Sequence, residues 1–216
     1  MSSATTPPDT SPRQILSLAV PAFLALVAES VFLLVDSAVV GRLGVTPLAG
    51  LGAAGAVLMT MAGVFVFLAY GTTAAVARRV GAGQLRAAIE DGWAGIWLAL
   101  GLGVAVAATT IAAAHPFVTA VGGSAAVLDQ AAVYLRISAL GLPALLVIMA
   151  ATGILRGLLD TRTPMLVAGV GFSANAVLNV LLVHGLDMGI AGAAWGSVIA
   201  QVGMALVLVG VVAHHS

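Results

Sequence analysis

The stretch that decides the fold is Leu-Leu-Val-Asp-Ser-Ala-Val-Val-Gly-Arg-Leu-Gly, residues 33–44. It closes an apolar segment long enough to cross a membrane, and it places the carboxyl group of Asp36 inside that segment. A second acid, Glu29, lies seven residues earlier, so the two side chains share one face of a helix. A charge in hydrocarbon costs roughly 2.5–3.5 kcal/mol on insertion scales, which makes an acid at this position a candidate functional group. We therefore expect Asp36, accompanied by Glu29, to bind and release a coupling ion.

The composition of the whole chain is that of a membrane protein. Of its 216 residues, 61% are hydrophobic and 7% are charged, and the mean hydropathy is +1.15. Soluble domains are typically about 25% charged. The formal net charge of zero argues against a nucleic-acid partner. Cysteine is absent, the histidines form no His-x-x-x-His pair, and no catalytic motif is present, so neither a metal site nor an enzyme is expected.

Six segments are apolar enough, over about 20 residues, to span a membrane. Alternating short strands are not visible, and a backbone in lipid is otherwise satisfied only by helices, so each span is predicted to be a helix. The chain is thus predicted to be an all-α membrane protein, with a disordered tail over 1–12 and one six-helix transmembrane unit over 13–213. The predicted spans are 15–40, 48–77, 93–114, 131–154, 165–183 and 190–213.

The basic residues are all arginine, and their placement indicates an orientation. If the amino terminus is cytoplasmic, only Arg42 falls in an outer connection, and Arg136 lies in the fourth span near its outer end. The other six fall on the inner side: Arg13, Arg78, Arg79, Arg86, Arg156 and Arg162. The positive-inside rule then predicts that both termini are cytoplasmic and that the inner arginines contact lipid headgroups. Residues 87–91, after the second span, are predicted to form a short polar helix on this side.

One tempting motif does not carry its usual meaning. Residues 50–55 read Gly-Leu-Gly-Ala-Ala-Gly, which matches the dinucleotide-binding fingerprint. That fingerprint requires a preceding strand and an acidic residue about 20 positions later, and neither is present. A nucleotide site is therefore not expected here.

Polar residues inside the spans indicate a shared cavity. With the orientation above, four of them lie in the outer half of the membrane, and Asn175 and Glu29 lie nearer the midplane. The four are Asp36, Tyr134, Asn179 and Ser197. The alternative is that the Asn, Ser and Tyr side chains only hydrogen-bond between helices, each contributing about 0.6 kcal/mol. No lysine or histidine lies in a span near Asp36, which leaves Arg42 and Arg136 as the cations within reach.

Several motifs in order resemble the multidrug and toxic compound extrusion (MATE) family, and most of all its DinF-like bacterial branch. The residues that carry the resemblance are 34–44, 77–83, 156–164, Asn175-x-x-x-Asn179 and 189–194. The resemblance implies a cation-coupled exporter of the bacterial inner membrane. It also implies two six-helix lobes related by an axis along the membrane normal.

The resemblance also implies roles for particular residues. Asp36 matches the proposed proton site of the N-terminal lobe, and Tyr134, Asn175 and Ser197 match residues proposed to form a network with it. Pro21 matches a proline at which the first helix bends. Asn179 stands where some proton-coupled relatives have an aspartate, which leaves Asp36, with Glu29, as the coupling acid.

The family usually has twelve spans, and six are predicted here, so the chain resembles the N-terminal lobe. We expect it to export drugs or other amphipathic or cationic small molecules with a second six-helix lobe. That lobe would come from a longer form of this chain, a separate chain or a second copy. The residues favour coupling to protons. Sodium is the alternative because Asp36, Asn175 and Asn179 offer oxygen ligands, and no other cofactor is expected.

Two further functions stay open at this point. A lipid-linked precursor flippase of the same superfamily would need cationic cavity residues for phosphate, and only Arg136 is near the expected cavity. A non-transporting six-helix membrane protein, acting in assembly or as a truncated product, is supported only by the six-span length.

Overall fold

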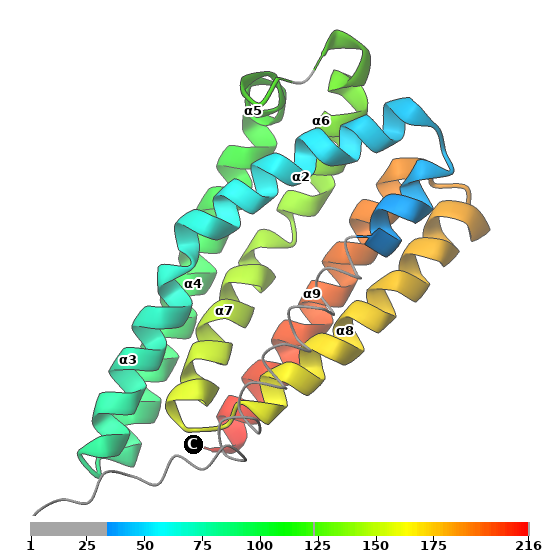
Figure 1. The fold of residues 1–216 in the computed structure, drawn as a ribbon. Helices are drawn as coiled ribbons and strands as arrows, with labels where there is room; N and C mark the ends of the chain where they lie inside the picture. The colour runs from blue at the N-terminus through cyan, green and yellow to red at the C-terminus, as the bar shows by residue number, and fades with distance from the viewer. Residues whose placement is uncertain (1–33, 123, 216) are drawn as a thin grey trace, which may run out of the picture.

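The computed structural model describes residues 34–122 and 124–215, and the described chain is entirely helical (Figure 1). Glu29, Pro21, the 1–12 tail and most of the first predicted span lie outside the described residues. After a helical segment at 34–41, the elements are α2 (Val45–Phe65), α3 (Phe67–Gly81), α4 (Leu85–Ala112), α5 (Ala114–Ala120), α6 (Ala125–Ala139), α7 (Leu142–Gly157), α8 (Arg162–Val180), the π-helix η1 (Leu181–Gly185) and α9 (Gly189–His214).

Four helical stretches of the described chain are long and apolar enough to cross a membrane. They are α2 with α3, α4 alone, α8 with η1, and α9 alone. A fifth arises when α6 and α7 count as one span, bent by 49° between them. The prediction of an all-α membrane fold is confirmed, and these helices cover the ranges of the second to sixth predicted spans. The bend in the fourth was not predicted.

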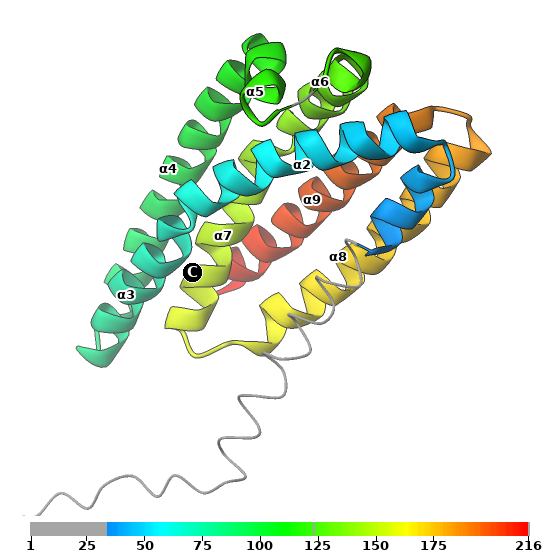
Figure 2. The ribbon, with the colours of Figure 1, turned by 45° about the horizontal axis from the view of Figure 1, so that its top comes forward.

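The helices pack in two groups. In Figures 1 and 2, α2 lies across α6, while α3, α4 and α7 lie side by side. The helices α8 and α9 form a pair, and α9 joins that pair to α6 and α7. One apolar cluster lies around Val40, Leu135 and Val183. A second lies around Leu146, Leu155 and Val212, further along the bundle.

Small residues let these helices approach closely. Gly50 in α2 faces α6, where a Cβ atom would lie 3.1 Å from the backbone nitrogen of Ala131. The Gly-Leu-Gly-Ala-Ala-Gly run at 50–55 therefore lies inside a helix, where Gly50 serves helix packing, as small residues do in membrane proteins. Gly52 and Gly55 have no atom within 4 Å of their Cβ positions.

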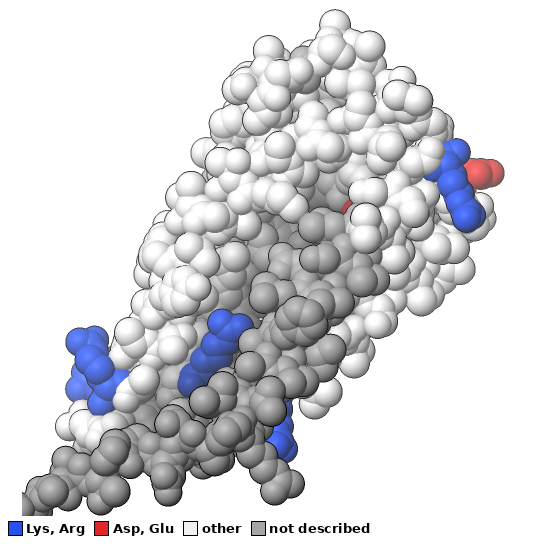
Figure 3. All heavy atoms as spheres, viewed as in Figure 1, with Lys and Arg blue, Asp and Glu red and all other residues white. Residues whose placement is uncertain are grey.

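Arginines gather at one end of the bundle. The α3–α4 turn, the α7–α8 turn and the end of α9 lie together there (Figure 1), and Figure 3 shows blue side chains over this end, below a largely uncharged face. In the α3–α4 turn, Arg79 Nε lies 2.9 Å from Asp91 Oδ2. Arg79 also donates to Gln84 Oε1 at 3.1 Å. One guanidinium group of α3 therefore contacts both the turn and the first part of α4.

The short polar helix predicted at 87–91 is wrong as a separate element. These residues belong to α4, which begins at Leu85. No proline interrupts α4, and the charged residues of its first turns are accommodated by pairing. Asp91 pairs with Arg79, and Glu90 lies 3.6 Å from Arg86 one turn earlier.

Asp160 caps the start of α8 at the same end of the bundle. Its Oδ1 accepts hydrogen bonds from the backbone N–H groups of Arg162 at 3.1 Å and Thr163 at 3.0 Å. These donors would otherwise be unpaired at a helix start. Partial burial disfavours the charged form, but the hydrogen bonds from Thr163 and Arg162 outweigh it, so the pKa of the Asp160 carboxyl is lowered.

We expect Asp160→Ala to lower the free energy of unfolding by about 1 kcal/mol at neutral pH, the usual effect of removing a cap. Because the folded pKa is lowered, the stabilisation by ionised Asp160 is present at neutral pH and is lost as the pH falls through that pKa. Asp160→Asn is the matched control, since it keeps the acceptor and removes the charge. Thermal unfolding in detergent should show that Asp160→Asn is nearly as stable as the wild-type protein at neutral pH. Its stability should lack the wild-type decrease that accompanies protonation of Asp160 at low pH. Equal loss for both variants would contradict the capping role.

Candidate functional site

A cavity of about 810 Å³ lies in the middle of the bundle. Its wall comes from the 34–41 segment, α2, α6, α7, α8 and α9. Most of the wall is apolar, with Leu51, Met59, Phe172 and Met204 among the larger side chains. Asp36 is the one charged residue among the described residues that line it. The polar lining residues are Asp36, Ser37, Tyr134, Ser138, Asn175, Ser197 and Gln201.

A chain of hydrogen bonds runs from Asp36 across α8 to α9. Asn179 Nδ2 donates to Asp36 Oδ1 and, at 2.9 Å, to Asn175 Oδ1. Asn175 Nδ2 donates to Ser197 Oγ at 3.1 Å. Ser197 in turn donates to the backbone carbonyl of Ala193 at 3.1 Å. The two asparagines can meet in this way because they lie one helical turn apart on α8.

The carboxyl group of Asp36 is buried but not paired with a cation. The residue is 6% exposed, and the ion pairs found in the described part of the chain do not involve it. Arg136, expected within reach of it, is exposed and donates to His115 Nδ1 at 3.1 Å. On its other side, His115 Nε2 lies 3.6 Å from Asp129 Oδ1. Among the described residues, the group that donates a hydrogen bond to the Asp36 carboxyl is therefore the neutral amide of Asn179.

Tyr134 lies on the same wall of the cavity. It is 5% exposed, and its phenol group is close enough to Asp36 to interact with its charge, with Ser138 and Ser197 beside it. Of the residues expected at the site, the structure brings together Asp36, Tyr134, Asn175, Asn179 and Ser197. Glu29 and Pro21 lie outside the described residues.

Glycines in α9 make room for Asn179. A Cβ atom on Gly196 would overlap Asn179 Oδ1, and one on Gly192 would lie 2.8 Å from the carbonyl oxygen of Leu182 in η1. The Oδ1 atom of Asn179 is buried and has no hydrogen-bond partner among the described residues. The close approach of α9 thus holds the Asn179 amide with both N–H groups facing Asp36 and Asn175. The π-helix that begins two residues later belongs to a class that is frequent at functional sites.

Sequence reasoning missed three polar lining residues, Ser37, Ser138 and Gln201. Ser37 directly follows Asp36 in the chain. Ser138 lies one turn after Tyr134 on α6, and Gln201 lies one turn after Ser197 on α9. The available signal was their i, i+4 spacing from those two residues, together with the Gly-Leu-Pro run at 141–143, which marks a helix break.

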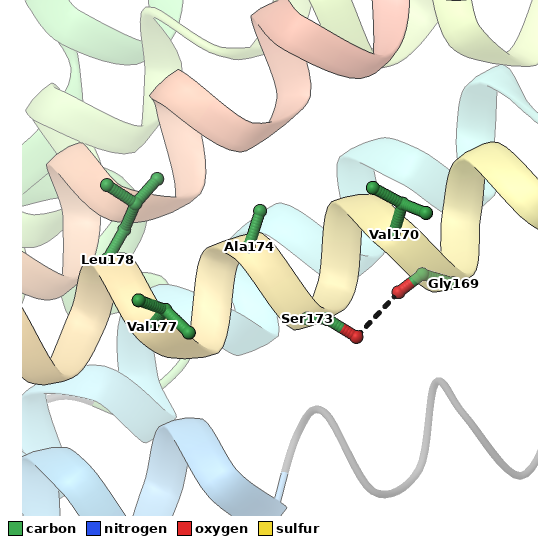
Figure 4. A pocket seen from close by; sticks show the side chains of 6 residues that line it. All are labelled: Gly169, Val170, Ser173, Ala174, Val177 and Leu178. Carbon is green, nitrogen blue, oxygen red and sulfur yellow. Dashed lines mark hydrogen bonds between the residues drawn. The ribbon is translucent and has the colours of Figure 1, made fainter.

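A second hollow, on α8, offers no comparable chemistry (Figure 4). All of its lining residues come from that one helix, and most are apolar. The hydroxyl group of Ser173 is already bonded to the carbonyl of Gly169 at 2.9 Å. The lining residues are Gly169, Val170, Ser173, Ala174, Val177 and Leu178.

Comparison with known proteins places this arrangement in a family. The sequence pattern of the family described as MatE matches residues 21–181. The chain belongs to the MatE family. This confirms the resemblance, and it makes the chain part of a multi-pass membrane transporter family rather than an enzyme family.

Individual relatives support the assignment. The chain is 34% identical over 212 residues to Protein DETOXIFICATION 44, chloroplastic, of Arabidopsis thaliana, covering 90% of this chain and 40% of that protein. It is 34% identical over 192 residues to DNA damage-inducible protein F of Escherichia coli, covering 88% and 42%. A structure described as an outward-facing multidrug resistance MATE family transporter of the MOP superfamily superposes with a TM-score of 0.83 at 28% identity. That match covers 90% of this chain and 43% of the other.

The MatE chain spans less than half the length of the relatives that it matches. Its helices correspond to one lobe of the solved MATE structure.

We expect Gly196→Ala to destabilise the protein, because the added methyl group would overlap Asn179 Oδ1. Overpacking of this kind costs typically 1–3 kcal/mol. Gly203→Ala is the matched control on the same helix, since no atom lies within 4 Å of its Cβ position. Thermal unfolding in detergent should show a lower midpoint for Gly196→Ala. For Gly203→Ala it should show an unchanged or higher midpoint, because alanine favours helix. A neutral Gly196→Ala would contradict the tight packing on Asn179.

Proposed function

We propose that this chain supplies the N-terminal lobe of a proton-coupled antiporter that exports cationic or amphipathic small molecules. The observation that carries the proposal is the buried carboxyl group of Asp36, the one acid among the described residues that line a large apolar cavity. It accepts a hydrogen bond from a neutral amide. The apolar wall suits the hydrophobic part of such a molecule, and the carboxylate suits its charge.

In this proposal the substrate and the proton compete for Asp36. Ionised Asp36 accepts the hydrogen bond of Asn179 and attracts a cation into the cavity. Protonation from the outer side removes that charge, so the cation loses its counter-ion and leaves outward. Asn179, Asn175 and Ser197 hold the carboxyl group in place through both states, because their amide and hydroxyl groups do not titrate near neutral pH. The bend proposed at Pro21 would accompany this step.

The transport cycle needs a second wall for the cavity. The chain is less than half as long as the relatives it matches, so we propose that a second six-helix lobe completes the transporter. Substrate would then leave the cavity when the two lobes rock against each other. We also propose a bacterial inner membrane with both termini in the cytoplasm. The clustering of Arg78, Arg79, Arg86, Arg156 and Arg162 at one end supports this orientation.

The cavity charge disfavours the flippase alternative. A phosphate-bearing lipid would call for arginine or lysine on the wall. The described lining has a carboxyl group and no basic side chain, and Arg136 points toward His115 instead.

We expect Asp36→Asn to reduce substrate export by about tenfold or more. Hydrogen bonds to charged groups contribute about 1.5–3 kcal/mol, and each 1.4 kcal/mol corresponds to a factor of ten. The measurement is uptake of a fluorescent lipophilic cation by energised everted vesicles that contain the natural protein in its own host membrane. Asp129→Asn is the matched control, because it removes a carboxylate that is 94% exposed and is not among the residues that line the cavity. Export that persists in Asp36→Asn, at normal protein abundance, would overturn the proposal.

The coupling ion is tested in the same vesicles. A pH gradient without sodium should drive uptake, and collapsing that gradient with a proton–cation exchanger should stop it. A sodium gradient alone should have no effect. Uptake driven by sodium alone would instead support the oxygen-ligand alternative at Asp36, Asn175 and Asn179.

A further inference from the structure

The break between α6 and α7 faces the cavity with polar groups that the coupling mechanism does not use. The two helices meet at 49°, and Pro143 lies in the first turn of α7. Because proline has no N–H group, the carbonyl of Ala139 lacks the donor that a continuous helix would supply. The break therefore leaves a backbone carbonyl without its helical donor, at a position between two lining residues, Ser138 and Leu142.

Two side chains accompany this break. Ser138, in the last turn of α6, is 7% exposed, and its Oγ is buried without a hydrogen-bond partner among the described residues. It lies close enough to the Tyr134 phenol group for the two hydroxyl groups to interact, although the geometry falls short of a full hydrogen bond. Gln201 on α9 holds its Oε1 against Gly141 so closely that a Cβ atom there would overlap it. Both side chains line the cavity.

The far side of the break is closed. Gly103 of α4 packs against Pro143, where a Cβ atom would lie 3.1 Å from the proline nitrogen. The helix α4 contributes no residue to the described cavity lining. The side chains of Ser138 and Gln201 can be reached by a ligand from the cavity, whose wall they form.

Helix geometry sets the depth of these groups. Ser138 follows Tyr134 by four residues on α6, and Gln201 follows Ser197 by four residues on α9. Both helices run away from the end of the bundle at which η1 lies (Figure 1), so both groups lie one turn deeper than Tyr134 and Ser197. Four residues of helix rise about 6 Å at 1.5 Å per residue. The cavity thus has one polar layer at Tyr134 and Ser197, near Asp36, and a second, neutral polar layer at Ser138 and Gln201, about one turn further in.

We propose that Ser138 and Gln201 form a hydrogen-bonding subsite for the substrate. It selects cationic amphiphiles that carry a neutral polar group, such as an amide, separated from the charged nitrogen by about one helical turn (about 5.4 Å) or more. The inference rests on the proposed function, because Asp36 is taken to hold that nitrogen.

The chemistry of the two side chains fits a neutral group. A hydroxyl and a carboxamide can each donate and accept a hydrogen bond, and no charged residue of the described lining lies at this layer. A buried hydroxyl group without a partner is costly. Rotation of the Ser138 side chain between staggered rotamers lets it meet a ligand group, and that cost is then removed.

The test compares two probes in everted vesicles containing the natural protein. One is an alkyltrimethylammonium ion. The other is an alkylamidopropyltrimethylammonium ion of equal overall length, whose amide is about 5–6 Å from the charged nitrogen, the span of one helical turn. In the Ser138→Ala/Gln201→Leu double variant, KM for the amide probe should rise about tenfold, as expected for two neutral hydrogen bonds. KM for the plain probe should stay within about twofold, and kcat for both should be unchanged.

The controls separate the subsite from the proposed function. Asp36→Asn should reduce transport of both probes by about tenfold or more, and Ser173→Ala, on the exposed face of α8, should change neither. The single variant Ser138→Ala provides a second test in case the double variant misfolds. It should show a smaller rise in KM for the amide probe. Equal changes for both probes, or no change for either, would overturn the subsite while leaving the antiporter intact. If the wild-type protein transports neither probe, the proposed function fails and the subsite with it.

Discussion

A carboxyl group inside a membrane protein must be neutralised, hydrated or hydrogen-bonded, and the arrangement around Asp36 follows from that requirement. The described residues supply a hydrogen bond from Asn179 and no cation. Asn179 is held by Asn175, and Asn175 by Ser197, which bonds to the α9 backbone. The chain of bonds therefore ties the 34–41 segment to α8 and α9. Asn179 donates in both directions, to Asp36 and to Asn175, so the carboxyl group meets the positive end of one fixed amide dipole.

Small residues are the second condition for this arrangement. Gly196 leaves the space that Asn179 occupies, and Gly192 brings α9 against η1. Gly103 and Gly141 do the same for the broken fourth span, on opposite sides of it. In lipid there is little hydrophobic force between helices, so close backbone contact and interhelical hydrogen bonds hold them together. The glycines that permit packing are therefore also the residues that position the polar groups.

Much of the fold followed from the sequence because hydropathy and length decide membrane spans almost alone. The positions of Asp36, Tyr134, Asn175 and Asn179 on converging spans could be inferred from depth, since helical rise is constant. Residues 87–91 were misjudged because charge suggested a separate helix, whereas Arg79 accommodates Asp91 within α4.

Other features depend on partners that are remote in the chain. The side chain of Arg136 turns outward because α5 presents His115 to it. The pairing of Gln201 with the break depends on how α9 packs against Gly141. Neither contact has a local signature, because each is set by helix packing rather than by spacing along one helix. The position of Ser138 on the cavity wall did have a local signature, because Ser138 follows Tyr134 by one turn on the same face of α6.

The one acid among the described residues of the cavity wall also sets an energetic limit on the proposed transport. If the transporter uses only the carboxyl group of Asp36, one cycle carries one proton inward and one monovalent cation outward, which moves no net charge. The membrane voltage would then contribute nothing, although 100 mV is equivalent to about 2.3 kcal/mol per elementary charge. Only the pH difference would remain as a driving force. Each pH unit would support at most about a tenfold concentration ratio of substrate across the membrane, because about 1.4 kcal/mol corresponds to a factor of ten.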